Sequence, residues 1–218
     1  MFGSKPRIKL ILASKSPRRA EILRNAGIVF EVQMAHVNEA RRPRESAHSY
    51  VRRLAAAKVR AVAEHAKRKK QHAIVIGADT VVLAQGKVLG KPADVKEARR
   101  MLRLLSGRTH RVLTGVAMVS LPSGKEVHHV EATRVKFLKI SGADIDDYIA
   151  TGEPFDKAGA YGIQGIGGRF VASIDGCYFN VMGLPLARVW GMLRDLGYAN
   201  ASAGRVWSAL RNLGSHAL

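Results

Sequence analysis

Cysteine is nearly absent from this sequence of 218 residues, since Cys177 is the single example. One thiol cannot form a disulfide within the chain, which excludes a disulfide-stabilised secreted domain. The apolar stretch near the N-terminus, residues 10–13, is shorter than the roughly 7 residues of a signal-peptide core. Nothing later approaches the ~20 residues of a membrane span. The sequence therefore predicts a soluble protein of the cytoplasm.

Acidic and aromatic residues are also scarce. Asp and Glu number 17 against 36 Lys and Arg, which gives a formal net charge of +19, and aromatic residues make up 6%. The positive charge is compatible with nucleic-acid binding, but the cations are spread over several predicted helices without the interleaved aromatic residues that stack on bases. A basic surface and an anionic substrate account for the charge. A nucleic-acid-binding protein without turnover stays as an alternative.

The remaining composition is that of a packed globular protein. Hydrophobic residues make up 47% and charged residues 24%, and the mean hydropathy is −0.06. These values lie within the globular range. We expect a single compact catalytic domain over residues 9–197, preceded by a basic leader, residues 1–8, and followed by a C-terminal tail or extra helix, residues 198–218.

Hydrophobic periodicity predicts alternating strands and helices. Strands are predicted over residues 9–13, 29–33, 73–83, 109–121, 126–138 and 169–174. Helices are predicted from Pro17 to Gly27 and over residues 46–69, 94–105, 141–149 and 184–196. The two longest strands should form an antiparallel hairpin, and the nearly continuous apolar run 73–83 should lie at the centre of the sheet. The pattern indicates an α/β fold with a mixed sheet flanked by helices.

Residues 14–19 combine a helix start with hydroxyl and cationic side chains. Ser16 is predicted as the N-cap and Pro17 as the first helical residue, and Arg18 and Arg19 follow. Backbone N–H groups at a helix N-terminus and two arginines suit a polyphosphate. The spacing of a P-loop is absent. The segment predicts a phosphate site, with helix capping alone as the alternative.

Charged residues near the predicted central strand suggest a catalytic centre. Asp79 is placed near the carboxyl end of this strand, where α/β sheets bind ligands, and burying a carboxylate is costly unless it is used or paired. Asp79 and Glu39 could together hold a divalent cation through oxygen atoms. Lys91 suits a phosphate oxygen, while Lys58 either extends over apolar surface or reaches the site. The histidines show no metal-ligand spacing.

Residues 152–168 are rich in glycine, which indicates close backbone approach to a ligand or positive φ angles. Gln164 lies in this segment, and its amide both donates and accepts hydrogen bonds, so it can read the edge of a base.

Several of these segments resemble the Maf family, also called the septum-formation inhibitors. They occur in family order and span about residues 9 to 197. The segments are LASKSPRR at 12–19, GADT at 77–80, GKP at 90–92, SGRTH at 106–110, DKAGAYGIQG at 156–165 and NVMGLPL at 180–186.

The resemblance implies a fold related to the inosine-triphosphate pyrophosphatases, with a twisted mixed sheet and two lobes around a central cleft. It also implies hydrolysis of a nucleoside triphosphate between its α and β phosphates. Asp79 would be the proton acceptor that activates water, beside Glu39 and a divalent metal, Mg²⁺ or Mn²⁺, with Lys91 also in the catalytic set. The residues expected to hold the triphosphate are Ser14, Arg18, Arg19, Lys58 and Lys91.

Within the family, the AGAYGIQG segment is similar to the branch that acts on dTTP and UTP. Arg19, Thr80 and Gln164 match the positions associated with the choice of a pyrimidine. Activity on 7-methyl-GTP or ITP stays as an alternative, and so does a regulator that senses nucleotides without cleaving them. The acidic and basic residues expected at the catalytic centre argue against such a sensor. The resemblance alone suggests a homodimer.

Overall fold

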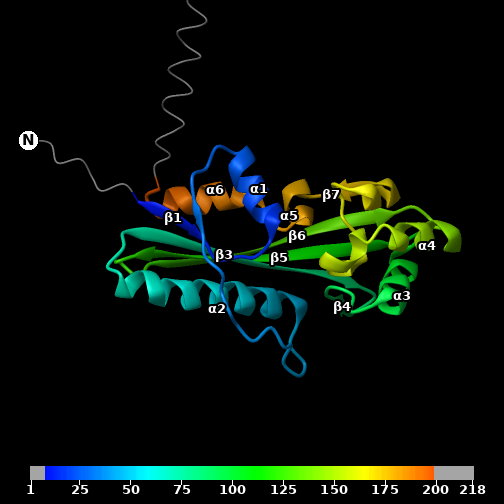
Figure 1. Cartoon of the computed structure of the whole chain (residues 1–218), viewed down its shortest axis with the longest axis horizontal. Helices are drawn as coiled ribbons and strands as arrows, with labels where there is room; N and C mark the ends of the chain where they lie inside the picture. Colours follow the sequence, from blue (N-terminus) through cyan, green and yellow to red (C-terminus); the bar gives the residue numbers. More distant parts are fainter. Residues whose placement is uncertain (1–7, 199–218) are drawn as a thin grey trace, which may run out of the picture.

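The computed structural model describes residues 8–198 (Figure 1). The predicted basic leader and C-terminal tail therefore lie outside the described residues, apart from Ile8 and Tyr198. The strands are β1 (Lys9–Leu12), β2 (Glu31–Val32), β3 (Ala73–Ala84), β4 (Lys87–Leu89), β5 (Thr109–Leu121), β6 (Glu126–Phe137) and β7 (Val171–Asp175). The α-helices are α1 (Pro17–Asn25), α2 (Ala47–Arg68), α3 (Val95–Leu105), α4 (Gly142–Ala150), α5 (Tyr178–Met182) and α6 (Leu186–Asp195). Three short 3-10 helices are η1 (Glu153–Asp156), η2 (Ala158–Ala160) and η3 (Ile166–Phe170).

One seven-stranded sheet runs along the molecule. The strand order is β2-β1-β3-β5-β6-β7, and β4 pairs with β3. β1 is parallel to β2 and to β3, while the other pairs are antiparallel. The predicted mixed sheet, the central place of β3 and the β5–β6 hairpin are confirmed.

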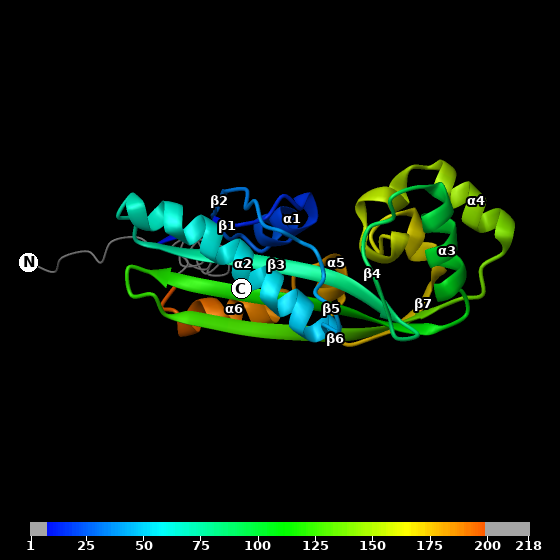
Figure 2. The same ribbon diagram turned by 90° about the horizontal axis from the view of Figure 1, so that it is seen from below.

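Two lobes share this sheet. In the first lobe, α1 and α6 cover one face and α2 covers the other (Figure 1). In the second lobe, α3, α4 and the 3-10 helices pack with the far ends of β3, β5 and β6 (Figure 2). Ile74 and Ile76 of β3 belong to the first core and Val82 to the second, so Asp79 and Thr80 lie on the stretch between the two cores.

The sheet has a notch along one edge of β3. β1 pairs with β3 only as far as Leu12, opposite Ile76, and β4 begins to pair at Val82. Residues 77–81 of β3 thus have no ladder partner on that edge in the described part of the chain. Because β1 ends here, the loop that follows it at residues 13–16 passes beside the notch.

Helix α2 packs directly on the backbone of the sheet because two strands carry glycine beneath it. A Cβ atom on Gly77 would lie 2.8 Å from the carbonyl oxygen of Ala55, and one on Gly115 would overlap the carbonyl group of Val51. Neither position accepts a larger residue without a shift of α2. Gly115 is also the ladder partner of Asp79, so the close approach brings α2 to the aspartate.

The structure changes several predicted boundaries. β2 covers two residues instead of 29–33, and the strand predicted from residue 169 begins at Val171 because η3 extends to Phe170. The last helix begins at Leu186, after Pro185 as its N-cap. β4 and α5 were not predicted, since elements of three and five residues are too short to show a period. Among residues 8–198, no helix is both long and apolar enough to cross a membrane.

Candidate active site

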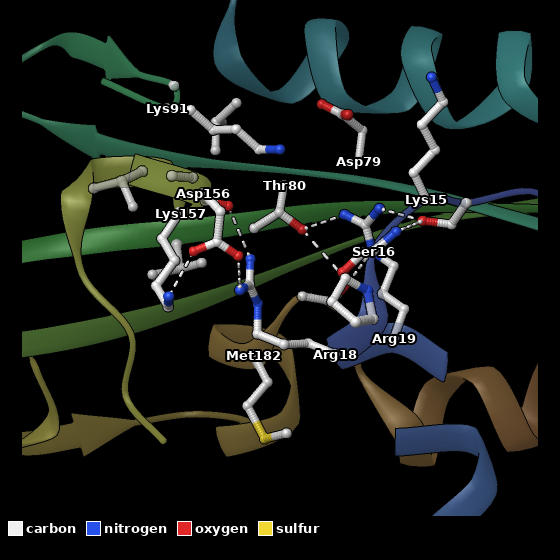
Figure 3. Close-up of a pocket in the computed structure, with 18 of the residues that line it drawn as sticks. Lys15, Ser16, Arg18, Arg19, Asp79, Thr80, Lys91, Asp156, Lys157 and Met182 are labelled. Carbon is white, nitrogen blue, oxygen red and sulfur yellow. Dashed lines mark hydrogen bonds and ion pairs between the residues drawn. The ribbon is translucent and has the colours of Figure 1, made fainter. Parts of the chain in front are cut away.

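A cavity of about 840 Å³ opens at the notch between the two lobes (Figure 3). This volume is in the range typical of small-molecule sites. The predicted site residues all line this cavity: Ser14, Arg18, Arg19, Glu39, Lys58, Asp79, Thr80, Lys91 and Gln164. They come from the loop after β1, the first turn of α1, the loop before α2, α2 itself, β3, the turn after β4 and the glycine-rich segment. The topology therefore brings together residues that are far apart in the sequence.

Buried polar side chains concentrate at this cavity. Ser14, Arg19, Lys58 and Asp79 are each no more than 9% exposed, although all four line it. Buried ionisable groups with shifted pKa values in a cleft are typical of functional sites.

The loop between β1 and α1 presents two hydroxyl groups beside the helix start. Ser16 occupies the N-cap and Pro17 the first turn, as predicted, but the Ser16 hydroxyl makes no capping hydrogen bond. Instead, the Ser16 backbone N–H donates to Ser14 Oγ at 3.2 Å. The predicted capping role of the Ser16 side chain is therefore wrong, and Ser16 lines the cavity.

The guanidinium of Arg19 is held in place by three hydrogen bonds. Its Nε donates to the Gly183 carbonyl at 2.8 Å, Nη1 to Ser14 Oγ at 3.0 Å and Nη2 to Thr80 Oγ1 at 3.0 Å. Burial lowers the pKa of the guanidinium, and the charge of Asp79 opposes this shift. A guanidinium has five N–H donors, so two remain beyond these three bonds. Arg19 thus joins three distant segments and keeps donors for a ligand.

Thr80 links Arg19 to a buried polar network behind the cavity. Its Oγ1 lies 2.9 Å from Thr114 Oγ1, and Thr114 donates to the Asn180 carbonyl at 3.2 Å. The Asn180 amide in turn donates to the Val112 carbonyl at 3.0 Å. This network holds α5, and with it the Gly183 carbonyl, against the sheet.

Lys58 brings the two predicted catalytic carboxylates together. Its Nζ lies 2.7 Å from Asp79 Oδ1 and 2.8 Å from Glu39 Oε1, and its side chain is 11% exposed. Two positions were predicted for the Lys58 side chain, over apolar surface or in the site, and the structure shows it in the site. Tyr50 donates to the Glu39 carbonyl at 2.8 Å and thereby fixes the loop that carries Glu39.

The two carboxylates differ in their electrostatic surroundings. Burial raises the pKa of Asp79, and the positive charges of Lys58 and Arg19 only partly oppose the rise. Partial burial also tends to raise the pKa of Glu39, but its hydrogen bond to Lys58 and the charges of Lys58, Lys91 and Arg19 lower the pKa below its ordinary value. Asp79 is therefore the stronger base, while Glu39 stays ionised.

The predicted place of Asp79 near the carboxyl end of its strand is wrong. β3 continues to Ala84 because it crosses into the second lobe, so Asp79 lies near the middle of its 12 residues. The strand end that opens the crevice belongs to β1, at Leu12. Asp79 follows Ile76, the partner of Leu12, by three positions, which still places it beside the carboxyl end of a parallel strand.

An ion pair that the sequence did not predict spans the cleft. Arg18 Nη1 lies 2.6 Å from Asp156 Oδ2, and its Nη2 donates to the Asp156 carbonyl at 3.1 Å (Figure 3). Lys157 Nζ lies 2.6 Å from Asp156 Oδ1. Burial tends to raise the pKa of Asp156, but Lys157 and Arg18 lower it below its ordinary value. The adjacent charges in the DKAG segment were the available signal for this contact.

The cavity as a whole favours an anion. Six cationic side chains line it, against the carboxylates of Glu39, Asp79 and Asp156. The cations are Lys15, Arg18, Arg19, Lys58, Lys91 and Lys157. Asp79 and Lys91 lie on the α2 side of Thr80, whereas Arg18 and Asp156 lie on the other side (Figure 3). A phosphate chain placed along the cavity would therefore meet cations from both lobes.

The carboxylates of Asp79 and Glu39 are oxygen donors that converge on one cation, the Lys58 ammonium. Among residues 8–198, no group of three or more His, Cys, Asp or Glu side chains gathers to hold a metal ion. Such a donor set fits Mg²⁺, which uses one or two carboxylates together with substrate phosphates and water. It does not fit a resident metal held by protein ligands alone.

Comparisons with known proteins identify the family of the chain. The family model described as Maf-like protein matches residues 9–196. A relative from Koribacter versatilis is 53% identical over 188 residues, which cover 86% of this chain and 94% of the relative. One from Carboxydothermus hydrogenoformans is 48% identical over 194 residues, which cover 88% of this chain and all of the relative. Both relatives are named dTTP/UTP pyrophosphatase.

Among solved structures, the chain is similar to a nucleoside-triphosphatase, or dITP/XTP pyrophosphatase, from Mycobacterium abscessus. The TM-score is 0.34 and the sequence identity 18%, over 61% of this chain and 76% of that one. The match of the family model over most of the described residues, together with relatives at about 50% identity, shows that the chain belongs to the family of Maf-like proteins.

Proposed function

We propose that this protein is a pyrophosphatase that hydrolyses dTTP and UTP to the nucleoside monophosphate and pyrophosphate. One observation carries the proposal: a buried aspartate with a raised pKa faces a cavity lined by six cations, and it is paired with Lys58, which also contacts Glu39. The names of the relatives at about 50% identity support the substrate.

The triphosphate lies along the cationic residues of the cavity. Arg18 and Lys91 approach it from opposite lobes, and Ser14 and Arg19 approach it from the first lobe, beside the N-terminus of α1. These groups neutralise the charge that builds up as the bond between the α and β phosphates breaks. Arg18 is paired with Asp156 in the structure, so phosphate binding exchanges one anionic partner of Arg18 for another.

Asp79 accepts a proton from the attacking water. Burial favours this role because a carboxylate with a raised pKa holds a proton more strongly than an ordinary aspartate. Lys58 keeps the carboxylate oriented by its 2.7 Å contact. The water forms a new bond to phosphorus, the α–β anhydride bond breaks, and pyrophosphate leaves.

Glu39 and Asp79 are the residues that would hold a divalent cation, Mg²⁺ or Mn²⁺, with the nucleotide phosphates as its remaining ligands. When bound, this cation supplies charge neutralisation at the phosphates and lowers the pKa of bound water. The ionised state of Glu39, favoured by Lys58 and Lys91, suits it to this task.

Selection of the pyrimidine base belongs to Arg19, Thr80 and Gln164. Arg19 and Thr80 are joined by a 3.0 Å hydrogen bond, so they present a fixed pattern of donors and acceptors. Gln164 lies in the glycine-rich segment of the second lobe and also lines the cavity. An amide that pairs with the base edge discriminates strongly, because a wrong base leaves buried polar groups unpaired.

The test is a pyrophosphate-release assay with Mg²⁺ or Mn²⁺ on dTTP, UTP, CTP, 7-methyl-GTP, ITP, ATP and GTP. We expect dTTP and UTP to be consumed fastest, with monophosphate and pyrophosphate as products and no reaction in EDTA. Faster consumption of 7-methyl-GTP or ITP would keep the reaction and overturn the substrate. No turnover with either metal would leave the regulator or the nucleic-acid-binding protein as the better explanation. The single-domain organisation, cytoplasmic location and homodimer stay predictions.

A further inference from the structure

The glycine-rich segment rests on a single carboxylate that the proposed reaction does not use. Glu153 Oε2 accepts the Ile166 backbone N–H at 2.8 Å, and Oε1 accepts the Gly167 N–H at 3.2 Å. Oε1 also accepts the hydroxyl of Tyr148 at 2.8 Å. Three donors therefore converge on Glu153 from the arc of residues 162–167 and from α4.

Tyr148 holds the other end of the same arc. Its side chain is fully buried, and its hydroxyl oxygen accepts the Gly162 backbone N–H at 3.3 Å while donating to Glu153. Burial and the contact with Glu153 raise the pKa of Tyr148, so it keeps its proton. Burial tends to raise the pKa of Glu153, but hydrogen bonds from Ile166, Tyr148 and Gly167 lower it below its ordinary value. At neutral pH the two form a phenol–carboxylate pair.

The arc of residues 162–167 packs closely against Glu153 and Tyr148. A Cβ atom on Gly165 would overlap the Glu153 carboxylate, and one on Gly167 would lie 2.5 Å from the Tyr148 hydroxyl oxygen. A Cβ atom on Gly162 would lie 2.5 Å from Lys157 Cε. None of these three glycines has a positive φ angle. At Gly165 and Gly167, a side chain would therefore displace the Glu153 carboxylate or the Tyr148 ring, whereas the flexible Lys157 side chain can move away from Gly162.

Gln164 lies at the centre of the arc and lines the cavity. Its side chain is exposed and makes no hydrogen bond with other side chains in the described part of the chain. The place of Gln164 at the cavity is therefore set by the backbone of residues 162–167, and that backbone is held by Glu153 and Tyr148.

We propose that Glu153 and Tyr148 are positioning residues for base selection: they fix the arc that carries Gln164 without touching the substrate. This inference rests on the proposed function, because it concerns which nucleotide that site accepts. It predicts that loss of the pair relaxes the choice of base while the triphosphate site stays intact.

The test compares the wild type with Glu153→Gln and Tyr148→Phe. Glutamine keeps the size of Glu153 but replaces one acceptor oxygen by an NH₂ group, which would face an N–H or O–H donor. Phenylalanine removes only the hydroxyl of Tyr148. We measure kcat/KM for dTTP, UTP, 7-methyl-GTP, ITP and GTP, and calorimetric binding of inorganic tripolyphosphate.

In both variants the ratio of kcat/KM for dTTP to that for GTP should fall by about tenfold to 100-fold, since small misplacements of a recognition group have effects of this size. Tripolyphosphate binding should stay within about twofold of the wild type. An unchanged ratio in the folded variants would overturn the inference, and so would an equal loss for all nucleotides together with weaker tripolyphosphate binding.

Ser141→Ala is the matched control. Ser141 Oγ accepts the Asp144 N–H at 3.1 Å and caps α4, the helix that carries Tyr148. Its loss removes the capping hydrogen bond of α4 but no contact of Glu153 or of the Tyr148 hydroxyl, so it should leave the base preference unchanged. Calorimetric binding of UMP and GMP gives a second measure of base preference. If no nucleotide is hydrolysed, the proposed function fails, while the UMP-to-GMP ratio in the variants still decides on Glu153 and Tyr148.

Discussion

Asp79 derives its basicity from its surroundings. Its ladder partner is Gly115, which has no side chain, and α2 closes over it with Lys58. Burial removes water from the carboxylate and raises its pKa, whereas Lys58 and Arg19 keep the charged form accessible. A carboxylate in this balance can take a proton from water and release it again.

Asp79→Asn is expected to fold and to lose activity by about 10²-fold to 10⁴-fold, the usual contribution of a general base. Because the pKa of Asp79 is raised in the folded state, its burial favours folding most at low pH, and this contribution is lost as the pH rises through the raised pKa. The asparagine variant should therefore be at least as stable as the wild type at neutral pH. Urea unfolding and pyrophosphate release measure the two effects.

The pH profile gives an independent check on Asp79. Activity should decline as the pH falls through its raised pKa, so the acid limb of kcat/KM should lie above the range of an ordinary aspartate. An acid limb at the ordinary position, or a folded Asp79→Asn variant with full activity, would contradict the role as base.

At the residue level, the sequence predicted which side chains line the site better than it predicted which side chains they contact. All nine predicted residues line one cavity. The contacts of Arg18 with Asp156 and of Lys58 with Asp79 join residues 138 and 21 positions apart. Hydrophobic periodicity carries no information on such pairs, because it shows only which face of its own helix or strand a residue occupies. The sequence likewise predicted Ser16 as the N-cap, but not that its side chain makes no capping hydrogen bond.

Helix α2 is the element on which the catalytic geometry depends. Its backbone packs on Gly77 and Gly115, and this contact places Lys58 beside Asp79. Any side chain at Gly115 would push the helix away from the strand.

Gly115→Ala should therefore lower the free energy of unfolding by about 1–3 kcal/mol, the usual cost of overpacking. It should also lower kcat, because Lys58 moves with α2. Gly191→Ala in α6 is the control: within residues 8–198, no atom outside the neighbouring backbone of α6 lies within 4 Å of its added Cβ. Alanine within a helix should stabilise by about 0.5–1 kcal/mol. Urea denaturation and kcat for dTTP report both. A Gly115→Ala variant as stable and active as the wild type would show that α2 is not held by this contact.

Among the helices and strands, the length of each element decided whether it could be predicted from the sequence. The long helices and strands, such as α2 and β5, match their predicted ranges to within a residue or two. β4, α5 and the three 3-10 helices were missed because three to five residues give no period. Their conformations depend on contacts with distant segments, such as the Gly159 N–H that donates at 2.9 Å to the carbonyl of Gly90, in the turn after β4.

The whole molecule is strongly basic, and part of its positive charge lines the cavity. Six cations line the cavity, within a chain whose formal net charge is +19. Such a field attracts a nucleoside triphosphate over a distance that shrinks as salt is added.

We therefore expect kcat/KM for dTTP to fall by about tenfold as NaCl is raised at a fixed concentration of divalent metal, with a smaller effect on kcat. Lys15→Gln, in the cavity, should weaken this dependence. Lys69→Gln, at the exposed C-terminal end of α2, should not. Steady-state kinetics over a salt series measures the effect. Equal changes in both variants would mean that the overall charge, rather than the cavity, attracts the substrate.

The two-lobed shape was expected from the family resemblance, whereas the notch was not. The notch follows from the short β1, which ends at Leu12, and the late start of β4 beside a β3 of 12 residues. Sequence patterns predicted the lengths of the long strands, but not the register that leaves residues 77–81 open between two neighbours.

The long strands that pass through both cores also have a mechanical consequence. β3, β5 and β6 continue from one lobe into the other without interruption, and β3 and β5 are paired across the whole stretch from Ala73 to Leu83. The two lobes are therefore joined by continuous, paired strands instead of a flexible linker. Such continuous pairing opposes a hinge motion between the lobes, so we expect nucleotide entry to involve small deformations spread along the sheet. Asp79 lies within β3 itself, and we expect it to keep its place as the two lobes adjust.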